Sequence, residues 1–138
     1  MKRILPLLVL ILAVAPLSLA KKHSLSVVGA TAHSTTLGIT PASQPSGVVV
    51  SSYNVFKAST SGGEVIGSPY ASVTSLTPPI TYVDSNVTPG ATAYYTVTAV
   101  CSACSSGLTQ SSFSNEVSAT TPNPIGPPNA PVISATAQ

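Results

Sequence analysis

The stretch "ATAYYTVTAV", residues 91–100, decides the fold class of this chain. Its residues alternate in type, so that one face carries Ala93, Tyr95, Val97 and Ala99, and the other carries Tyr94, Thr96, Thr98 and Val100. A period of two, built from aromatic and β-branched residues, is the pattern of a β-strand. We therefore predict a strand here.

Shorter segments with the same period lie on both sides of this strand and are separated by Gly, Pro, Ser and Asn. They are predicted at about residues 24–30, 33–40, 49–58, 64–68, 80–84 and 114–121. Gly62 and Gly63 favour a hairpin between the third and fourth of the seven strands, because glycine accepts the positive φ of a tight turn. With no convincing helical stripe after residue 20, the pattern predicts an all-β, immunoglobulin-like antiparallel sandwich of seven strands.

The first 20 residues have the features of a signal peptide. Lys2 and Arg3 precede an apolar run from Ile4 to Pro16, and small residues follow at "SLA", residues 18–20. The run is shorter than the roughly 20 residues of a membrane-spanning helix, although a retained N-terminal anchor stays as an alternative. Cleavage after Ala20 leaves 118 of the 138 residues in a secreted, periplasmic or cell-surface protein with no further membrane contact.

The mature chain carries almost no charge. Three lysines (Lys21, Lys22 and Lys57) balance three acids (Glu64, Asp84 and Glu116), which gives a formal net charge of zero. Nucleic acid is therefore not an expected partner, because such binding depends on clustered Lys and Arg.

The end of the chain differs in composition from the rest. Residues 122–138, "PNPIGPPNAPVISATAQ", are rich in proline, which blocks ladder hydrogen bonds and favours an extended linker or tail.

Four blocks together resemble the fibronectin type III domain, in the form common in secreted bacterial proteins. They are "HSTTLGIT" (33–40), "YNVFKASTSGG" (53–63), "TYVDSNVTPGATAYYTVTAV" (81–100) and "SFSNEVSATTP" (112–122). The resemblance covers residues 24–121 and implies a single domain over 21–121, after the signal peptide at 1–20. It also suggests that "PPNAPVISATAQ" is the start of a further repeat, with a disordered terminus as the alternative.

The chain departs from this family at two positions. The family's usual tryptophan is replaced by Ile39, and its usual tyrosine, four residues before the inward valine, falls at Ala93. Losing large aromatic side chains removes core area at roughly 25 cal/mol per Å². We expect a less stable domain, or Tyr53, Tyr82 and Tyr95 closing into the space.

Cys101 and Cys104 allow three interpretations. A redox dithiol of this spacing needs a helix N-terminus, and none is predicted nearby. A zinc site needs four ligands, and His33 is expected roughly 20 Å away at the other end of the sandwich. A disulfide across a turn suits the spacing and an oxidising compartment, whereas free thiols or an intermolecular link remain alternatives.

The sequence shows no catalytic constellation. No two of the carboxylates Glu64, Asp84 and Glu116 stand at a spacing that the fold obviously brings together, and His23 and His33 are expected to be exposed at strand ends. We therefore expect no enzyme, no catalytic residues, no metal and no cofactor.

Other residues suggest weaker features. Tyr94 or Phe56, if exposed, would form a stacking platform for sugar or peptide, and otherwise a cross-strand pair. "NVT", residues 86–88, matches a glycosylation acceptor.

The expected function is that of an exported, non-catalytic binding or spacer module. Its partner would be a protein or a polysaccharide, held at the loops 41–47 and 101–112 at one end of the sandwich. The alternative is a structural subunit that forms homo-oligomers by lending residues 132–137 as a strand to a neighbour.

Overall fold

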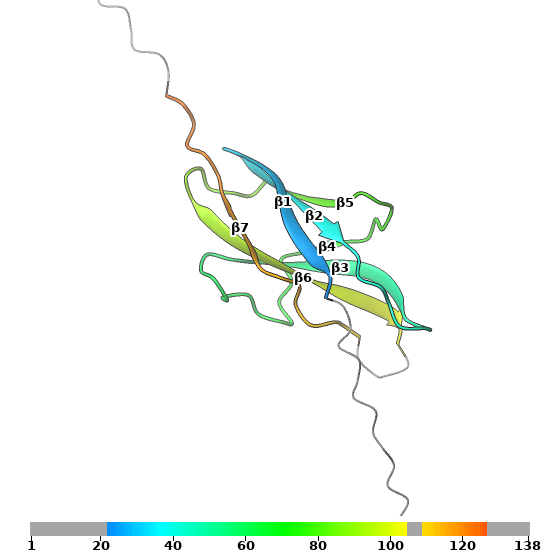
Figure 1. The fold of residues 1–138 in the computed structure, drawn as a ribbon. Coiled ribbons are helices and arrows are strands. Elements are labelled where there is room, and N and C mark those ends of the chain that lie inside the picture. The colour runs from blue at the N-terminus through cyan, green and yellow to red at the C-terminus, as the bar shows by residue number, and fades with distance from the viewer. Residues whose placement is uncertain (1–21, 105–108, 127–138) are drawn as a thin grey trace, which may run out of the picture.

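A computed structural model describes residues 22–104 and 109–126 (Figure 1). These residues form seven strands: β1 (Ser24–Thr31), β2 (Ser34–Thr40), β3 (Val49–Ala58), β4 (Ala71–Val73), β5 (Ile80–Asp84), β6 (Thr92–Ala103) and β7 (Val117–Thr120). The predicted signal peptide lies outside the described residues, as does the tail from residue 127 onward.

The strands pair into two antiparallel sheets. One sheet has the order β1-β2-β5, and the other has the order β4-β3-β6-β7. The sheets lie over one another, with β1, β2 and β5 in one layer (Figure 1). The predicted all-β sandwich is therefore confirmed, and so is the predicted strand at residues 91–100, which forms most of β6.

The core between the sheets is built from the inward side of the alternating pattern. It consists of Leu25, Leu37, Ile39, Tyr53, Val55, Val73, Ile80, Tyr95, Val97, Ala99 and Ala119. Tyr53 and Tyr95 are fully buried, and Tyr82 is half-buried against them. These are the three tyrosines expected to close into the space, so tyrosine supplies the aromatic bulk in a core without tryptophan.

The fourth strand is not where the sequence predicted it. Residues 64–68 form turns, with Gly67 at φ +99° and the Ser68 amide donating to the Val65 carbonyl at 3.2 Å. Gly67 and Pro69 interrupt pairing here, because proline has no N–H to donate. The strand begins after them, at Ala71–Val73, and pairs with Tyr53–Val55 of β3.

The last strand is shorter than predicted, because residues 109–116 follow β6 without forming a regular ladder. The Ser114 amide donates to the Val97 carbonyl at 2.8 Å, but the Val97 amide donates to the Ser114 hydroxyl at 3.0 Å. Ser111 makes the same pair of bonds with Ala99, each at 2.9 Å. Serine hydroxyls thus replace main-chain carbonyls as acceptors, and the regular strand begins only at Val117.

The outer face of the four-stranded sheet is partly covered. Phe56 is 1% exposed and meets the Phe113 ring edge-on, with the ring centroids 5.0 Å apart. Thr98, on the same face of β6, is buried and accepts a hydrogen bond from the Gln110 side-chain amide at 2.5 Å. Phe56 is therefore not an exposed platform but the alternative, a cross-strand pair with Thr96 on the sheet face, and Phe113 of the segment 109–116 packs on it; Tyr94 is half-buried.

Candidate functional site

The two cysteines and the loop 41–48 lie at the same end of the sandwich, which we call the cysteine end. Val49, which follows the loop, pairs with Ala103 at the end of β6. Cys101 and Cys104 are joined by a disulfide with their Cα atoms 5.9 Å apart. The structure thus supports the predicted disulfide, and such a short ring restrains one turn rather than the whole fold.

His23 anchors the loop 41–48 at the cysteine end. The Ala42 amide donates to His23 Nδ1 at 3.0 Å, and the Tyr53 hydroxyl lies 3.4 Å from the same nitrogen. The Gln44 side-chain amide is 3.3 Å from His23 Nε2. His23 is only 6% exposed, so the expectation of an exposed strand-end histidine is wrong for His23 and holds only for His33. A residue just before the first strand is buried because the following loop folds back over it.

The buried position of His23 predicts a pH dependence of stability. Burial lowers the pKa of His23 below its ordinary value of 6.5. As the pH falls below that value the unfolded chain takes up a proton before the folded chain does, so the free energy of unfolding declines between about pH 7 and pH 5. Urea denaturation followed by circular dichroism at several pH values measures this decline.

Two variants test the assignment of that pH dependence. His23→Gln is expected to flatten the decline, and His33→Gln is expected to keep it, because His33 is exposed. An unchanged decline in His23→Gln would show that another group is responsible.

The opposite end of the sandwich holds a buried ion pair. Lys57 Nζ lies 2.7 Å from Asp84 Oδ2, which also accepts from the Tyr95 hydroxyl at 2.7 Å. Asp84 Oδ1 accepts from the Tyr70 hydroxyl at 3.0 Å and from the Asn86 amide at 2.9 Å. Asp84 is 1% exposed and the Lys57 side chain 19%. All four donors therefore converge on one buried carboxylate.

The protonation states follow from these contacts. Burial alone raises the pKa of Asp84, but the hydrogen bonds from Lys57, Tyr95, Asn86 and Tyr70 outweigh it and hold that pKa below its ordinary value. Burial, together with the hydrogen bond to the Asp84 carboxylate, raises the pKa of Tyr95. At neutral pH the carboxylate is therefore charged and the phenol neutral.

The sequence does indicate this ion pair once the strand faces are considered together with the charges. Asp84 shares its strand face with Tyr82 and the core residue Ile80, two and four places back, and Lys57 shares its face with Tyr53 and Val55. A charge at an inward position needs a partner of opposite sign. Lys57 is the only cation within the strands, so the two could have been paired.

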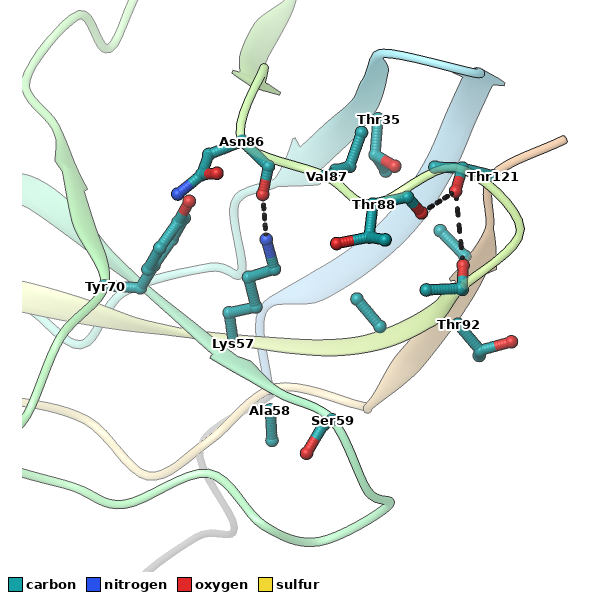
Figure 2. Close-up of a pocket in the computed structure, with 13 residues that line it drawn as sticks. Thr35, Lys57, Ala58, Ser59, Tyr70, Asn86, Val87, Thr88, Thr92 and Thr121 are labelled. Carbon is teal, nitrogen blue, oxygen red and sulfur yellow. Dashed lines mark hydrogen bonds between the residues drawn. The ribbon is translucent and has the colours of Figure 1, made fainter. Parts of the chain in front are cut away.

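A pocket of about 360 Å³, here called the end pocket, opens beside this ion pair (Figure 2). One wall comes from the strand ends, with Ala58, Ala93 and Ala119, and the other comes from the connection between β5 and β6, with Val87. In Figure 2 the Lys57 ammonium reaches the Asn86 carbonyl, at 2.5 Å. Ala93 and Ala119 stand at inward positions where larger residues would fill this space, and Ala93 is where the family resemblance places a tyrosine.

The connection between β5 and β6 is held in place by hydrogen bonds. The Thr121 hydroxyl donates to the Thr88 carbonyl at 2.6 Å, and Figure 2 shows the two residues at the edge of the pocket. The Gly90 amide donates to the Thr121 carbonyl at 2.9 Å. This wall of the end pocket is therefore tied to the end of β7.

Two carboxylates do come together, contrary to the expectation from sequence. Glu116 accepts from the Ser61 hydroxyl and the Gly62 amide, each at 2.6 Å, and thereby ties the turn after β3 to the start of β7. Burial and the nearby Glu116 raise the pKa of Glu64. Neither glutamate lines the end pocket. Glu116 holds this turn in place. The alternating pattern of the strands could not reveal the contact, because the turn residues belong to no strand.

Within residues 22–104 and 109–126, no group of three or more His, Cys, Asp or Glu side chains is placed to hold a metal ion. The same part of the chain contains no helix with the length and hydropathy needed to span a membrane.

Comparison with known proteins places the fold. No protein-family model and no curated protein sequence matches the chain. Among solved structures, the sixth fibronectin type III domain of human fibronectin type III domain containing protein 3 superposes with a TM-score of 0.57 at 17% identity, covering 79% of this chain and 91% of that domain. A second structure, of a fibronectin type III domain of human fibronectin type III domain containing protein 3, superposes with a TM-score of 0.52 at 21% identity. The match covers 85% of this chain and 99% of that domain.

One similar structure is part of an enzyme. A β-1,2-glucanase from Parabacteroides distasonis matches with a TM-score of 0.55 at 24% identity, over 76% of this chain. The match covers 13% of the glucanase chain, so it concerns one small part of that protein. Identities at this level show a common fold and nothing more.

Proposed function

We propose that this chain, which has the fold of a fibronectin type III domain, is an exported, non-catalytic module that contacts a protein or a polysaccharide through its cysteine end. The fold supports a binding or spacer role. The observation that carries the proposal is the way the cysteine end is built, because two segments with exposed residues are fixed there to a rigid sandwich.

Both segments at the cysteine end are anchored, and each carries exposed residues among those the structure describes, which in the second segment are Ser102, Thr109 and Ser112. Residues 43–47 are exposed, while His23 holds the start of their loop and the Val48 amide donates to the Pro45 carbonyl at 3.2 Å. The disulfide at Cys101 and the bond from the Cys101 amide to the Thr109 carbonyl, at 2.9 Å, restrain the second segment. Exposed residues on restrained loops lose little conformational entropy on binding.

The first experiment tests export. The full chain is expressed in a secreting host, and the protein outside the cytoplasm is weighed by mass spectrometry before and after alkylation. We expect the mass of residues 21–138 and no alkylation unless a reductant is added, because both thiols are bonded. An uncleaved chain, or one that is alkylated without reductant, would contradict export with a closed disulfide.

The second experiment tests binding at the cysteine end. β-1,2-glucan is the first probe, because one similar structure lies within a β-1,2-glucanase. Calorimetric titration compares the parent with a Ser43→Glu, Ser46→Glu variant and with a control carrying the same changes at Ser72 and Ser118, exposed on β4 and β7. Weaker binding in the loop variant alone supports the proposal. Equal binding in all three proteins places the contact elsewhere.

Strand donation is a second candidate function, favoured by one open sheet edge. β1 and β5 are the edges of the three-stranded sheet, and Asn115 covers β1 by bonding both the amide and the carbonyl of Leu25. Among residues 22–104 and 109–126, β5 pairs with β2 alone and exposes Val83. A neighbour's residues 132–137, which lie outside the described residues, would add there. Analytical sedimentation of the mature chain with and without residues 122–138 tests strand donation. Oligomers that require the tail support it, and a monomer in both cases excludes it.

A further inference from the structure

The loop 41–48 depends on one side chain for its attachment to the sandwich. It crosses from the end of β2 in one sheet to the start of β3 in the other. Within the described part of the chain, its only hydrogen-bond partner outside the loop is His23, which contacts the Ala42 amide and the Gln44 side chain. Residues 43–47 are exposed, so their side chains add little packing. The state of His23 therefore decides whether the loop is held.

The contacts of His23 fix the protonation state of its ring. A main-chain N–H can only donate, so the Ala42 amide at 3.0 Å requires Nδ1 to be unprotonated and to accept. The Tyr53 hydroxyl, 3.4 Å from the same nitrogen, then also donates to it. The proton of the neutral ring is therefore on Nε2. A second proton would go to Nδ1 and point at the Ala42 N–H, so a charged ring and an attached loop exclude each other.

No charged group within residues 22–104 and 109–126 stabilises a charged His23 ring. Tyr53 is the titratable group that contacts the ring, and burial raises its pKa, so it stays neutral. Residues 41–48 contain no titratable side chain. Burial alone shifts the pKa of His23, and it does so downward. No ion pair or hydrogen bond joins the ring to the charged side chains of these residues, which are Lys22, Lys57, Glu64, Asp84 and Glu116.

We propose that the loop 41–48 is released in mild acid, with His23 as the group that responds to pH. When Nδ1 takes up a proton from solvent it stops accepting from the Ala42 amide, and the loop leaves the sandwich while the strands stay paired. This release requires no partner and is distinct from unfolding of the whole domain. Because the loop belongs to the cysteine end, acid would also weaken the contact proposed there, and that consequence alone rests on the proposed function.

The test is amide hydrogen exchange of the purified chain, followed by NMR from about pH 7.5 to about pH 4.5. Each rate is divided by that of an unstructured peptide at the same pH, which gives a protection factor. His23 in the released loop has its ordinary pKa of 6.5, so protection of the Ala42 amide is expected to fall by up to about tenfold at pH 5.5 and further at pH 4.5. The Gly90 amide, bonded to the Thr121 carbonyl at the opposite end, is the internal control and is expected to keep its protection.

Two variants assign the effect to His23. His23→Gln keeps a side chain that can accept from the Ala42 amide but does not titrate, so protection of that amide is expected to be independent of pH. His33→Gln is the matched control and is expected to keep the pH dependence, because His33 is exposed. If circular dichroism shows that His23→Gln does not fold, the ring nitrogens of the parent give a second readout. Protonation of Nδ1 is then expected at the pH where the Ala42 amide loses protection.

Three results would overturn the release of the loop. The first is protection of the Ala42 amide that changes less than twofold down to about pH 4.5. The second is a loss of protection that persists in His23→Gln or does not coincide with protonation of Nδ1. The third is an equal loss at the Gly90 amide, which would mean that the whole sandwich opens. None of these measurements uses a binding probe, so they stand whether or not the cysteine end binds a partner.

Discussion

Asp84→Asn is expected to lower the free energy of unfolding by about 3–5 kcal/mol, the usual cost of removing one partner of a buried ion pair. The amide keeps the shape of the carboxylate but removes its charge, so the Lys57 ammonium loses its counter-ion. The Asn side chain also has an NH2 group in place of one carboxylate oxygen. That group would face a tyrosine hydroxyl that donates to the carboxylate in the parent, since Tyr70 and Tyr95 each donate to one oxygen of Asp84. For a domain whose total stability is about 5–15 kcal/mol, this loss is severe.

Urea denaturation followed by circular dichroism measures this effect, and a double-mutant cycle assigns it. Lys57→Met alone leaves the carboxylate unpaired and is also expected to destabilise. The combination of Lys57→Met with Asp84→Asn is expected to lose less than the sum of the two single losses, because the ammonium that the amide would leave without a counter-ion is then absent. Additive losses in the double variant would mean that the two charges do not support each other.

The same carboxylate predicts an acid dependence of stability. Because the folded pKa of Asp84 lies below its ordinary value of 3.8, the unfolded chain binds the proton first as the pH falls. The stabilisation is present above about pH 5 and is lost as the pH falls through 4 and below. Asp84→Asn is expected to show a smaller decline over this range than the parent, and Glu64, whose pKa is raised, contributes with the opposite sign.

The strands of the sandwich could be predicted because alternation is a local property. Leu37 and Ile39, or Tyr95 and Val97, reach the core through the period of two alone. The predicted faces therefore agree with the structure in β2 and β6. The short β4 could not be placed in this way, because Ala71–Val73 is too brief for a pattern and its position depends on where Gly67 and Pro69 stop the preceding turn.

The contacts that build the two ends of the sandwich depend on tertiary structure. His23 is buried because a loop some 20 residues later folds over it, and nothing in the neighbouring residues indicates this. Asp84 and Lys57 are different, because strand parity places both on inward faces and charge balance then suggests their pairing. The sequence indicated the end pocket at one position only, because Ala93 stands where the family that the chain resembles has a tyrosine.

Phe56→Ala is expected to destabilise the chain by about 3–5 kcal/mol, the cost of emptying a buried phenylalanine site. Phe56 is on the face of β3 opposite to the core residue Val55, yet it is 1% exposed. An exposed aromatic on a sheet face would cost less than about 0.5 kcal/mol on removal. The size of the loss therefore decides whether the outer face of the sheet is a covered apolar layer or a free surface.

The covering ring gives this prediction its control and connects it to the cysteine end. Phe113→Ala removes the ring that meets Phe56 edge-on, and a double-mutant cycle is expected to yield a coupling of about 0.5–1.5 kcal/mol. Phe113 belongs to the segment 109–116 and packs on Phe56 of β3, so its loss should speed hydrogen exchange of the Ser111 and Ser114 amides, which bond to β6. Tyr94→Ala, at a half-buried position, should cost less than Phe56→Ala and leave those amides protected. Unchanged hydrogen exchange in Phe113→Ala would mean that the hydrogen bonds of Ser111 and Ser114 alone hold this segment. The Phe56–Phe113 pair would then not stabilise the loops of the cysteine end.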